Sequence, residues 1–128
     1  GALEFLVWLR SRYQVAIISD TFYELAGPLL SKLHNPMTLC HRLTVGSDGN
    51  IIGYRLRQVD PKRHCVKAFQ SLGYEIVAAG DSYNDISMLE QAENGILFQP
   101  SEKVVNDFPD FPVALNYEEL KVMYTESM

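Results

Sequence analysis

The fold of this chain is decided by residues 75–92, which read EIVAAGDSYNDISMLEQA. Residues 75–79 predict a short strand, because Glu75 is followed by the apolar run 76–79, of the kind found in buried parallel strands. The loop Gly-Asp-Ser-Tyr-Asn-Asp follows at 80–85, and the pattern after it predicts a helix to about Ala92. A strand that leads through a polar loop into a helix is the repeating unit of α/β sheets.

The segments on both sides of this stretch continue the alternation. Thr21 and Glu24 have the spacing of a capping box, and Pro28 is expected to kink or split the helix that they open. Asp60 at the N-cap and Gly73 beyond the end frame another helix. The patterns predict helices at 2–12, 22–33, 61–72, 101–107 and 116–124, strands at 15–18 and 95–98, and a hairpin of 38–45 with 51–57. We therefore expect an α/β fold with a mostly parallel sheet and right-handed crossovers.

Composition and charge exclude several classes of protein. With 128 residues, 47% of them hydrophobic, the chain is long enough to bury a core and is not disordered. Its net charge of −5 disfavours a nucleic-acid partner. No segment is apolar for long enough to span a membrane, and the first residues lack the order of a signal peptide, so we expect a cytoplasmic protein. The two cysteines have no metal-binding spacing and are expected to be buried thiols.

Polar residues follow two of the predicted strands, where ligands collect in open α/β sheets. Ser19 and Asp20 follow the strand at 15–18, whereas Asp81, Asn84 and Asp85 follow the strand at 75–79. Two carboxylates four residues apart, with an amide between them, supply the oxygen ligands that Mg²⁺ prefers. The histidines 34, 41 and 64 have no ligand spacing and are expected at the surface or the core edge.

Each of these features also has a purely structural interpretation. The 80–85 loop can be a turn in which Asn84 or Asp85 caps the next helix, and Ser19-Asp20-Thr21 can serve only as a helix cap. Lys62, in a first helical turn, opposes the helix dipole, which suggests a compensating anion, but exposed lysines are common. The order of the three features along the chain favours the functional interpretation.

Four stretches carry a resemblance to a known family: IISDTFYE at 17–24, LCHRL at 39–43, GYRLRQVDPKR at 53–63 and AAGDSYND at 78–85. They resemble the haloacid dehalogenase superfamily of phosphotransferases in its phosphoserine phosphatase branch, above all the bacterial bifunctional phosphoserine phosphatase/homoserine phosphotransferases. The resemblance covers nearly the whole chain. It implies a Rossmann-like three-layer sandwich and Mg²⁺-dependent phosphoryl transfer through a phosphoaspartate.

The resemblance also implies a role for individual residues. Ser19 would donate its hydroxyl to the phosphate together with the backbone N–H of Asp20, and Lys62 would neutralise charge on the phosphoryl oxygens. Asn84 would contact the substrate or its phosphate. For the metal, Asp81 would ligate Mg²⁺, while Asp85 would hold a metal-bound water or order the ligand shell.

One motif of the resembled family is absent. Its D-x-D/E-G sequence, which carries the nucleophilic aspartate and an acid/base on the first strand, has no counterpart here, because the chain contains no D-x-D or D-x-E. The family's cap region is missing too. We therefore expect residues 1–128 to be the C-terminal portion of a phosphatase core domain. In the family the first strand lies between the strands that correspond to 15–18 and 75–79, so we expect these edges to close up or to self-associate.

Two functions follow as expectations. The parent protein would be a Mg²⁺-dependent phosphatase or phosphotransferase that acts on a small phosphomonoester such as phosphoserine, with homoserine as a candidate acceptor. The 128 residues taken alone would instead be a non-catalytic module that binds Mg²⁺ and phosphate or another protein, because the nucleophile is not among them.

Overall fold

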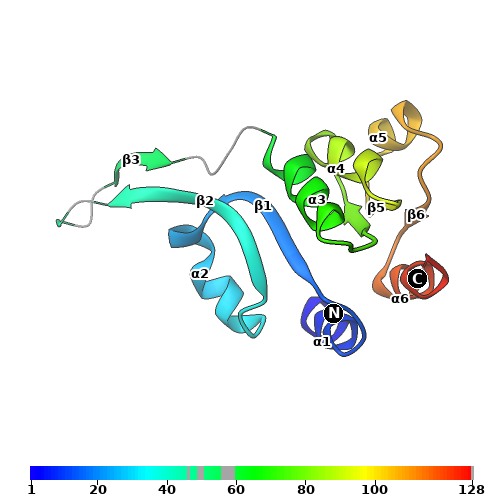
Figure 1. The fold of residues 1–128 in the computed structure, drawn as a ribbon, viewed down its shortest axis with the longest axis horizontal. Helices are drawn as coiled ribbons and strands as arrows, with labels where there is room; N and C mark the ends of the chain where they lie inside the picture. The colour runs from blue at the N-terminus through cyan, green and yellow to red at the C-terminus, as the bar shows by residue number, and fades with distance from the viewer. Residues whose placement is uncertain (46, 49–50, 56–59, 128) are drawn as a thin grey trace. The chain divides into compact units, whose positions relative to one another are not determined.

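The computed structural model describes residues 1–45, 47–48, 51–55 and 60–127, and the chain divides into two compact units. The first unit, Gly1–Pro61, contains helices α1 (Ala2–Arg10) and α2 (Tyr23–Lys32) and strands β1 (Ala16–Phe22), β2 (Met37–Val45) and β3 (Ile51–Arg55). The second unit, Lys62–Met128, contains all but the first residue of α3 (Pro61–Ser71), followed by β4 (Val77–Gly80), η1 (Tyr83–Asp85), α4 (Ile86–Gln91), β5 (Asn94–Phe98), α5 (Glu102–Asp107), β6 (Val113–Ala114) and α6 (Tyr117–Ser127). Figure 1 shows this order along the chain.

The sheet of the first unit has the strand order β1-β2-β3. β1 runs parallel to β2, with Ile18 opposite Leu39, and the register shifts before Phe22 pairs with His41. β2 and β3 pair antiparallel, which confirms the predicted hairpin. Part of the turn predicted to join them, residues 49–50, lies outside the described residues.

The start of α2 differs from the prediction. β1 extends through Thr21 to Phe22, so the N-cap position falls on Phe22, which makes no side-chain capping hydrogen bond. The predicted capping box of Thr21 and Glu24 is therefore wrong, because the pairing of Phe22 with His41 extends β1 past Thr21. Pro28 lies inside α2 without splitting it.

β1 is also less buried than its apolar sequence predicts. All of its residues are half-buried except Asp20, which is exposed. A continuous β-branched run is typical of strands covered on both sides. β1 is an end strand of its sheet, with β2 as its neighbour, and this position explains its partial exposure.

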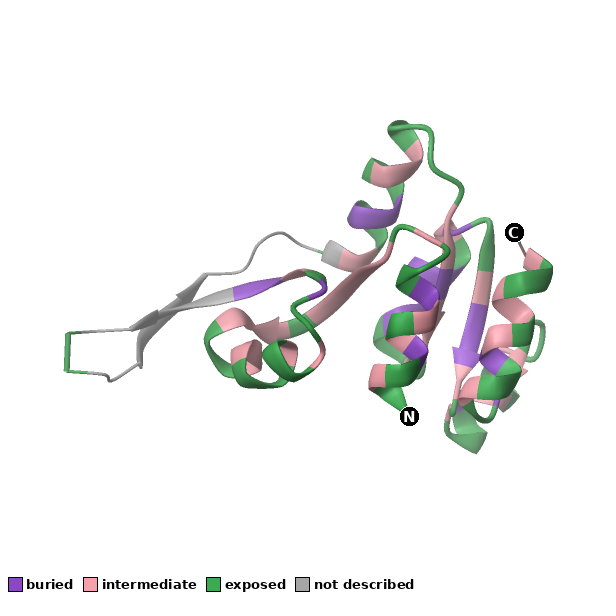
Figure 2. Cartoon of the chain, turned by 90° about the horizontal axis from the view of Figure 1, so that it is seen from below, coloured by how far each residue is buried: buried purple, intermediate pink, exposed green. Residues whose placement is uncertain are grey.

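The second unit is built on a parallel sheet in the order β4-β5-β6. Val77 pairs with Asn94 and Gly80 with Leu97, so β4 ends one residue before the end of β5. The most buried hydrophobic residues of this unit come from all of its α-helices and from β5 and β6: Val66, Leu89, Ile96, Leu97, Val104, Ala114 and Leu120. Figure 2 shows the buried residues of the chain in purple. The short strand β6 was not predicted, since the two prolines before it indicated only irregular chain.

α3 confirms the prediction made from its end signals. The helix begins at Pro61, whose fixed φ suits a first helical position, and it ends at Ser71. Gly73 then adopts a φ of 94°, a left-handed conformation that favours glycine. Asp60 has a φ of 47°, so its backbone is left-handed instead of extended as in a typical N-cap.

Within the described residues, no helix combines the length and the apolar character needed to cross a bilayer.

Candidate functional site

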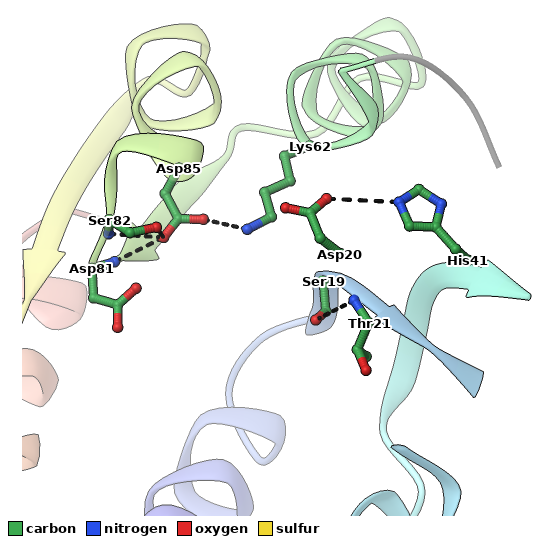
Figure 3. Close-up of polar contacts among 8 residues, drawn as sticks. All are labelled: Ser19, Asp20, Thr21, His41, Lys62, Asp81, Ser82 and Asp85. Carbon is green, nitrogen blue, oxygen red and sulfur yellow. Dashed lines mark hydrogen bonds and ion pairs between the residues drawn. The ribbon is translucent and has the colours of Figure 1, made fainter. Parts of the chain in front are cut away.

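The loop after β4 is organised by the carboxylate of Asp85. One oxygen, Oδ2, accepts hydrogen bonds from the backbone N–H of Asp81 at 2.9 Å and of Ser82 at 3.2 Å, and from the Ser82 hydroxyl at 3.4 Å. Ser82 and Asp85 together form a capping box at the start of η1. The turn interpretation is correct only for η1, because Asp85 is also the N-cap residue of α4 but makes no side-chain capping hydrogen bond there. Figure 3 shows the hydrogen-bond donors around Asp85.

Gly80 makes this close packing possible. A Cβ atom at position 80 would lie 2.5 Å from the Cβ and 2.6 Å from the Cγ of Asp85, which is closer than real Cβ contacts. Any larger residue would push Asp85 away from the two N–H groups that it binds. Glycine is needed here for space, not for its conformational freedom.

The second oxygen of Asp85 holds the ammonium group of Lys62 from the first turn of α3. The Nζ to Oδ1 distance is 2.5 Å, and the side chains of Lys62 and Asp85 are only 12% and 8% exposed. Burial alone would raise the pKa of Asp85, but the Lys62 ammonium and the N–H groups of Asp81 and Ser82 outweigh it and lower the pKa below its ordinary value of 3.8. Asp85 is therefore ionised at neutral pH and fixes a cation at the start of α3.

Asp81 and Asn84 present the exposed polar groups of this loop. The Asp81 carboxylate points away from Asp85 (Figure 3). The described residues contain no group of three or more His, Cys, Asp or Glu side chains that could hold a metal. Mg²⁺ commonly binds one or two protein carboxylates and completes its shell with water and phosphate oxygens, so one exposed carboxylate fits it. The oxygens of Asp85 already accept from N–H, hydroxyl and ammonium donors, which fits an ordering role better than direct ligation.

In the first unit, Ser19 and Asp20 lie in β1. The Ser19 Oγ accepts a hydrogen bond from the backbone N–H of Thr21 at 3.2 Å. The Oδ1 of Asp20, which is half exposed, lies 3.7 Å from the Nε2 of His41, and the His41 ring packs on Phe22 at a centroid distance of 6.0 Å.

Sequence reasoning did not single out His41 as a neighbour of Asp20. It is buried, as befits a core-edge histidine, and it comes from the neighbouring strand β2. The signal that could have found it is the register that places His41 opposite Phe22, but a parallel register cannot be read from sequence.

The structure thus brings together three of the predicted site residues in the second unit. Asp81 and Asp85 belong to the loop after β4, and Lys62 of α3 forms an ion pair with Asp85. Asn84 belongs to the same loop. Ser19 and Asp20 belong to the other unit. Their convergence with Lys62 and Asp81 on one ligand stays a prediction, as do the individual roles.

The charge of Asp85 makes stability depend on pH. Because its pKa is lower in the folded protein, this group stabilises the fold above pH 3.8, and the contribution disappears as the pH falls through the folded value. We expect Asp85→Asn to lower the free energy of unfolding at pH 7 by about 3 kcal/mol, since it removes the carboxylate that forms an ion pair with the half-buried Lys62 ammonium. Urea titrations from pH 7 to 2.5 should show this difference shrinking in acid. An Asp110→Asn control, at an exposed carboxylate, should show none, and a pH-independent difference for Asp85→Asn would contradict the assignment.

A polar loop follows a strand of a parallel sheet here and leads into a helix, which makes the chain an α/β protein. In open sheets of this class, ligands bind at the carboxyl ends of the strands. Residues 1–90 match a family described as haloacid dehalogenase-like hydrolase, and residues 63–119 match a second family with the same description. The chain belongs to the haloacid dehalogenase-like hydrolase family.

Individual relatives point to one branch of this family. The chain is 54% identical over 121 residues to phosphoserine phosphatase ThrH of Pseudomonas aeruginosa, covering 94% of this chain and 59% of that protein. It is 53% identical to a phosphoserine phosphatase of Pseudomonas syringae pv. tomato, covering 94% of this chain and 51% of the relative. A structure of a phospho-aspartyl intermediate analogue of phosphoserine phosphatase superimposes with a TM-score of 0.76 at 26% identity, covering 97% of this chain and 62% of the other.

These comparisons confirm the resemblance to the phosphoserine phosphatase branch and the α/β fold of the haloacid dehalogenase type. The chain spans between half and three fifths of the length of these curated relatives, at 51% and 59%.

Proposed function

We propose that the protein is a Mg²⁺-dependent phosphomonoester phosphatase that acts on phosphoserine and can pass the phosphoryl group to an acceptor alcohol such as homoserine. The observation that carries the proposal is the Lys62 ammonium held 2.5 Å from Asp85, in the loop that also presents the exposed carboxylate of Asp81. A fixed cation beside an oxygen ligand is what phosphoryl transfer needs, because its transition state spreads charge over the equatorial oxygens. The names of the relatives support the same substrate.

Four groups of the chain would bind the phosphate in this proposal. The Ser19 hydroxyl and the backbone N–H of Asp20 would donate hydrogen bonds to its oxygens, and the Asn84 amide would contact the substrate. Lys62 would neutralise charge on the phosphoryl oxygens, and Asp85 keeps its ammonium group in place. An ammonium that is already oriented costs little reorganisation when charge develops during the reaction.

Asp81 would hold the Mg²⁺ through its exposed carboxylate, with Asp85 ordering the loop through the Asp81 N–H. When bound, the ion would polarise the phosphoryl oxygens and reduce their negative charge. The acidic net charge of the chain, −5, does not oppose this, because local groups set the potential inside a site.

We assign the nucleophile of the proposed reaction to a part of the protein outside residues 1–128. No D-x-D or D-x-E sequence is present to supply the pair of aspartates that the family resemblance implies. In the proposed reaction an aspartate carboxylate forms a bond to phosphorus while the P–O ester bond breaks, and a second acid gives its proton to the leaving serine oxygen. Water or the acceptor alcohol then attacks the phosphoaspartate and frees the carboxylate.

For residues 1–128 on their own we propose a different property, a binding module for Mg²⁺ and phosphate. The missing motif favours this, since Lys62 and Asp81 can attract phosphate and Mg²⁺ while the aspartate pair assigned to form the phosphoaspartate is absent from residues 1–128. β1 and β4 are end strands of their sheets and offer edges for pairing, so we also propose that this chain alone self-associates.

One experiment separates the two proposals. Phosphate release from phosphoserine is measured with and without Mg²⁺ and homoserine, on the full-length protein and on residues 1–128. We expect Mg²⁺-dependent release from the full-length protein only, with phosphohomoserine formed when homoserine is present. Light scattering of the shorter chain should give a mass above that of one copy. A full-length protein that is inactive on phosphoserine would refute the enzymatic proposal, and a folded monomer would refute self-association.

A further inference from the structure

The aromatic residue in the middle of the site loop is anchored to a helix that the proposed reaction does not use. Asp85 binds the beginning of the loop through the N–H groups of Asp81 and Ser82. Tyr83, the first residue of η1, extends its side chain to α5 and to the residue after it. The loop therefore has a second point of attachment, at its centre.

Three groups of the α5 region hold the Tyr83 ring. The phenol donates a hydrogen bond to Oδ2 of Asp107, the last residue of α5. Phe108 packs edge-on to the ring at a centroid distance of 5.9 Å, and the Lys103 ammonium lies 5.9 Å from the ring centre. Lys103 and Asp107 are four residues apart on α5, so they lie on one face of the helix, and the ring spans that face.

The α5 region is itself well fixed. Ser101 caps the helix by accepting a hydrogen bond from the N–H of Val104, and the side chain of Val104 is only 2% exposed. Phe108 also contacts Phe111, at a centroid distance of 6.5 Å. Because the Tyr83 ring is attached to this region, its contacts also restrict the position of the η1 backbone.

We propose that Tyr83 is a positioning residue of the substrate site: through Asp107 and Phe108 it fixes η1, and thereby the exposed Asn84 that follows it. This inference rests on the proposed function, in which Asn84 contacts the substrate. Tyr83 would act through its neighbour Asn84 and would touch neither the reacting atoms nor the metal. Its loss should therefore weaken substrate binding and leave the chemical step nearly intact.

The test uses the full-length protein and three variants at this contact. Tyr83→Phe removes only the hydroxyl, Asp107→Ala removes the acceptor, and Asp107→Asn keeps a carbonyl acceptor. Tyr74→Phe is the matched control, because Tyr74 is also exposed, at 50% against 44% for Tyr83, and its ring likewise meets one phenylalanine edge-on.

Hydrogen exchange of the peptide that contains residues 81–86 is measured first, since it does not depend on activity. We expect exchange about three- to tenfold faster in Tyr83→Phe and in Asp107→Ala, the size of one lost hydrogen bond, and no change in Tyr74→Phe. Asp107→Asn should stay close to the wild type. The double variant Tyr83→Phe/Asp107→Ala should be no worse than either single one, because both remove the same bond. Unchanged exchange in Tyr83→Phe, or additive effects in the double variant, would overturn the attachment.

Kinetics with phosphoserine test the consequence for the site. We expect the KM of Tyr83→Phe to rise about three- to tenfold with kcat changed less than twofold, and the KM of Asp107→Asn to stay at the wild-type value. Faster exchange with unchanged KM would refute the positioning role. A wild-type protein without phosphoserine hydrolysis would refute the proposed function instead, while the exchange data would still decide whether the attachment exists.

Discussion

Replacing Asp81 by Asn should abolish Mg²⁺-dependent turnover of phosphoserine in the full-length protein. The substitution keeps the size of the side chain and removes the negative charge that would bind the ion. Its structural cost should be small, because the Asp81 contact to Asp85 is made by the backbone N–H and not by the carboxylate. A metal contribution of about 4 kcal/mol to the transition state corresponds to roughly a thousandfold loss of rate.

The measurement is phosphate release over a range of Mg²⁺ concentrations, together with calorimetric titration of Mg²⁺. Asp110→Asn serves as the control, since it neutralises another exposed carboxylate of the same unit without touching the loop. Unchanged turnover in Asp81→Asn would remove Asp81 from the site. A circular dichroism spectrum identical to that of the wild type would show that the loss is chemical and not a failure to fold.

The second large effect concerns Lys62, for which we expect two separable losses in Lys62→Met. Activity should fall by about 10²- to 10³-fold, the effect of removing one preorganised donor to developing charge, or ~2.7 to 4 kcal/mol. Stability should fall as well, by about 3 kcal/mol, because Asp85 would be left buried with its Oδ1 deprived of the ammonium 2.5 Å away.

A double variant separates the two losses. In Lys62→Met/Asp85→Asn the buried charge is gone, so the free energy of unfolding should recover part of what either single variant loses. The rate should not recover, because no cation has returned to the site. Equal recovery of rate and stability would mean that Lys62 is a structural residue only, and a fall confined to KM would indicate binding without transition-state stabilisation.

Much of the fold could be predicted from the sequence, because some residues have intrinsic backbone preferences that mark where a helix begins or ends. Pro61 and Gly73 indicated the ends of α3 in advance. The helix predicted at 101–107 is also present as α5, although its cap, Ser101, was not singled out. The capping box at Thr21 had equally good spacing and was still wrong. The neighbouring strand β2 extends β1 through Thr21, and this pairing outweighs a local preference that is worth only about 1 kcal/mol.

The candidate site could be predicted only in part, because its contacts join residues that are far apart in the sequence. Residue types and order indicated Lys62, Asp81 and Asp85, but not that both oxygens of Asp85 would be taken, one by N–H and hydroxyl donors and the other by an ammonium from a residue 23 positions away. Such contacts depend on how α3 packs against the loop. The attachment of Tyr83 to α5 has the same character, since Asp107 is 24 residues further along the chain.

The double use of Asp85 limits how this protein can be recombined. The same carboxylate closes the loop after β4 and receives the first charged side chain of α3. A chimera that takes residues 80–85 from a homologue must therefore take the first turn of the helix at 61–71 from the same homologue. Otherwise it combines a lysine and an aspartate from different proteins in one ion pair. A crossover point beyond α4 avoids this problem, because Lys62 and Asp85 then come from the same parent protein.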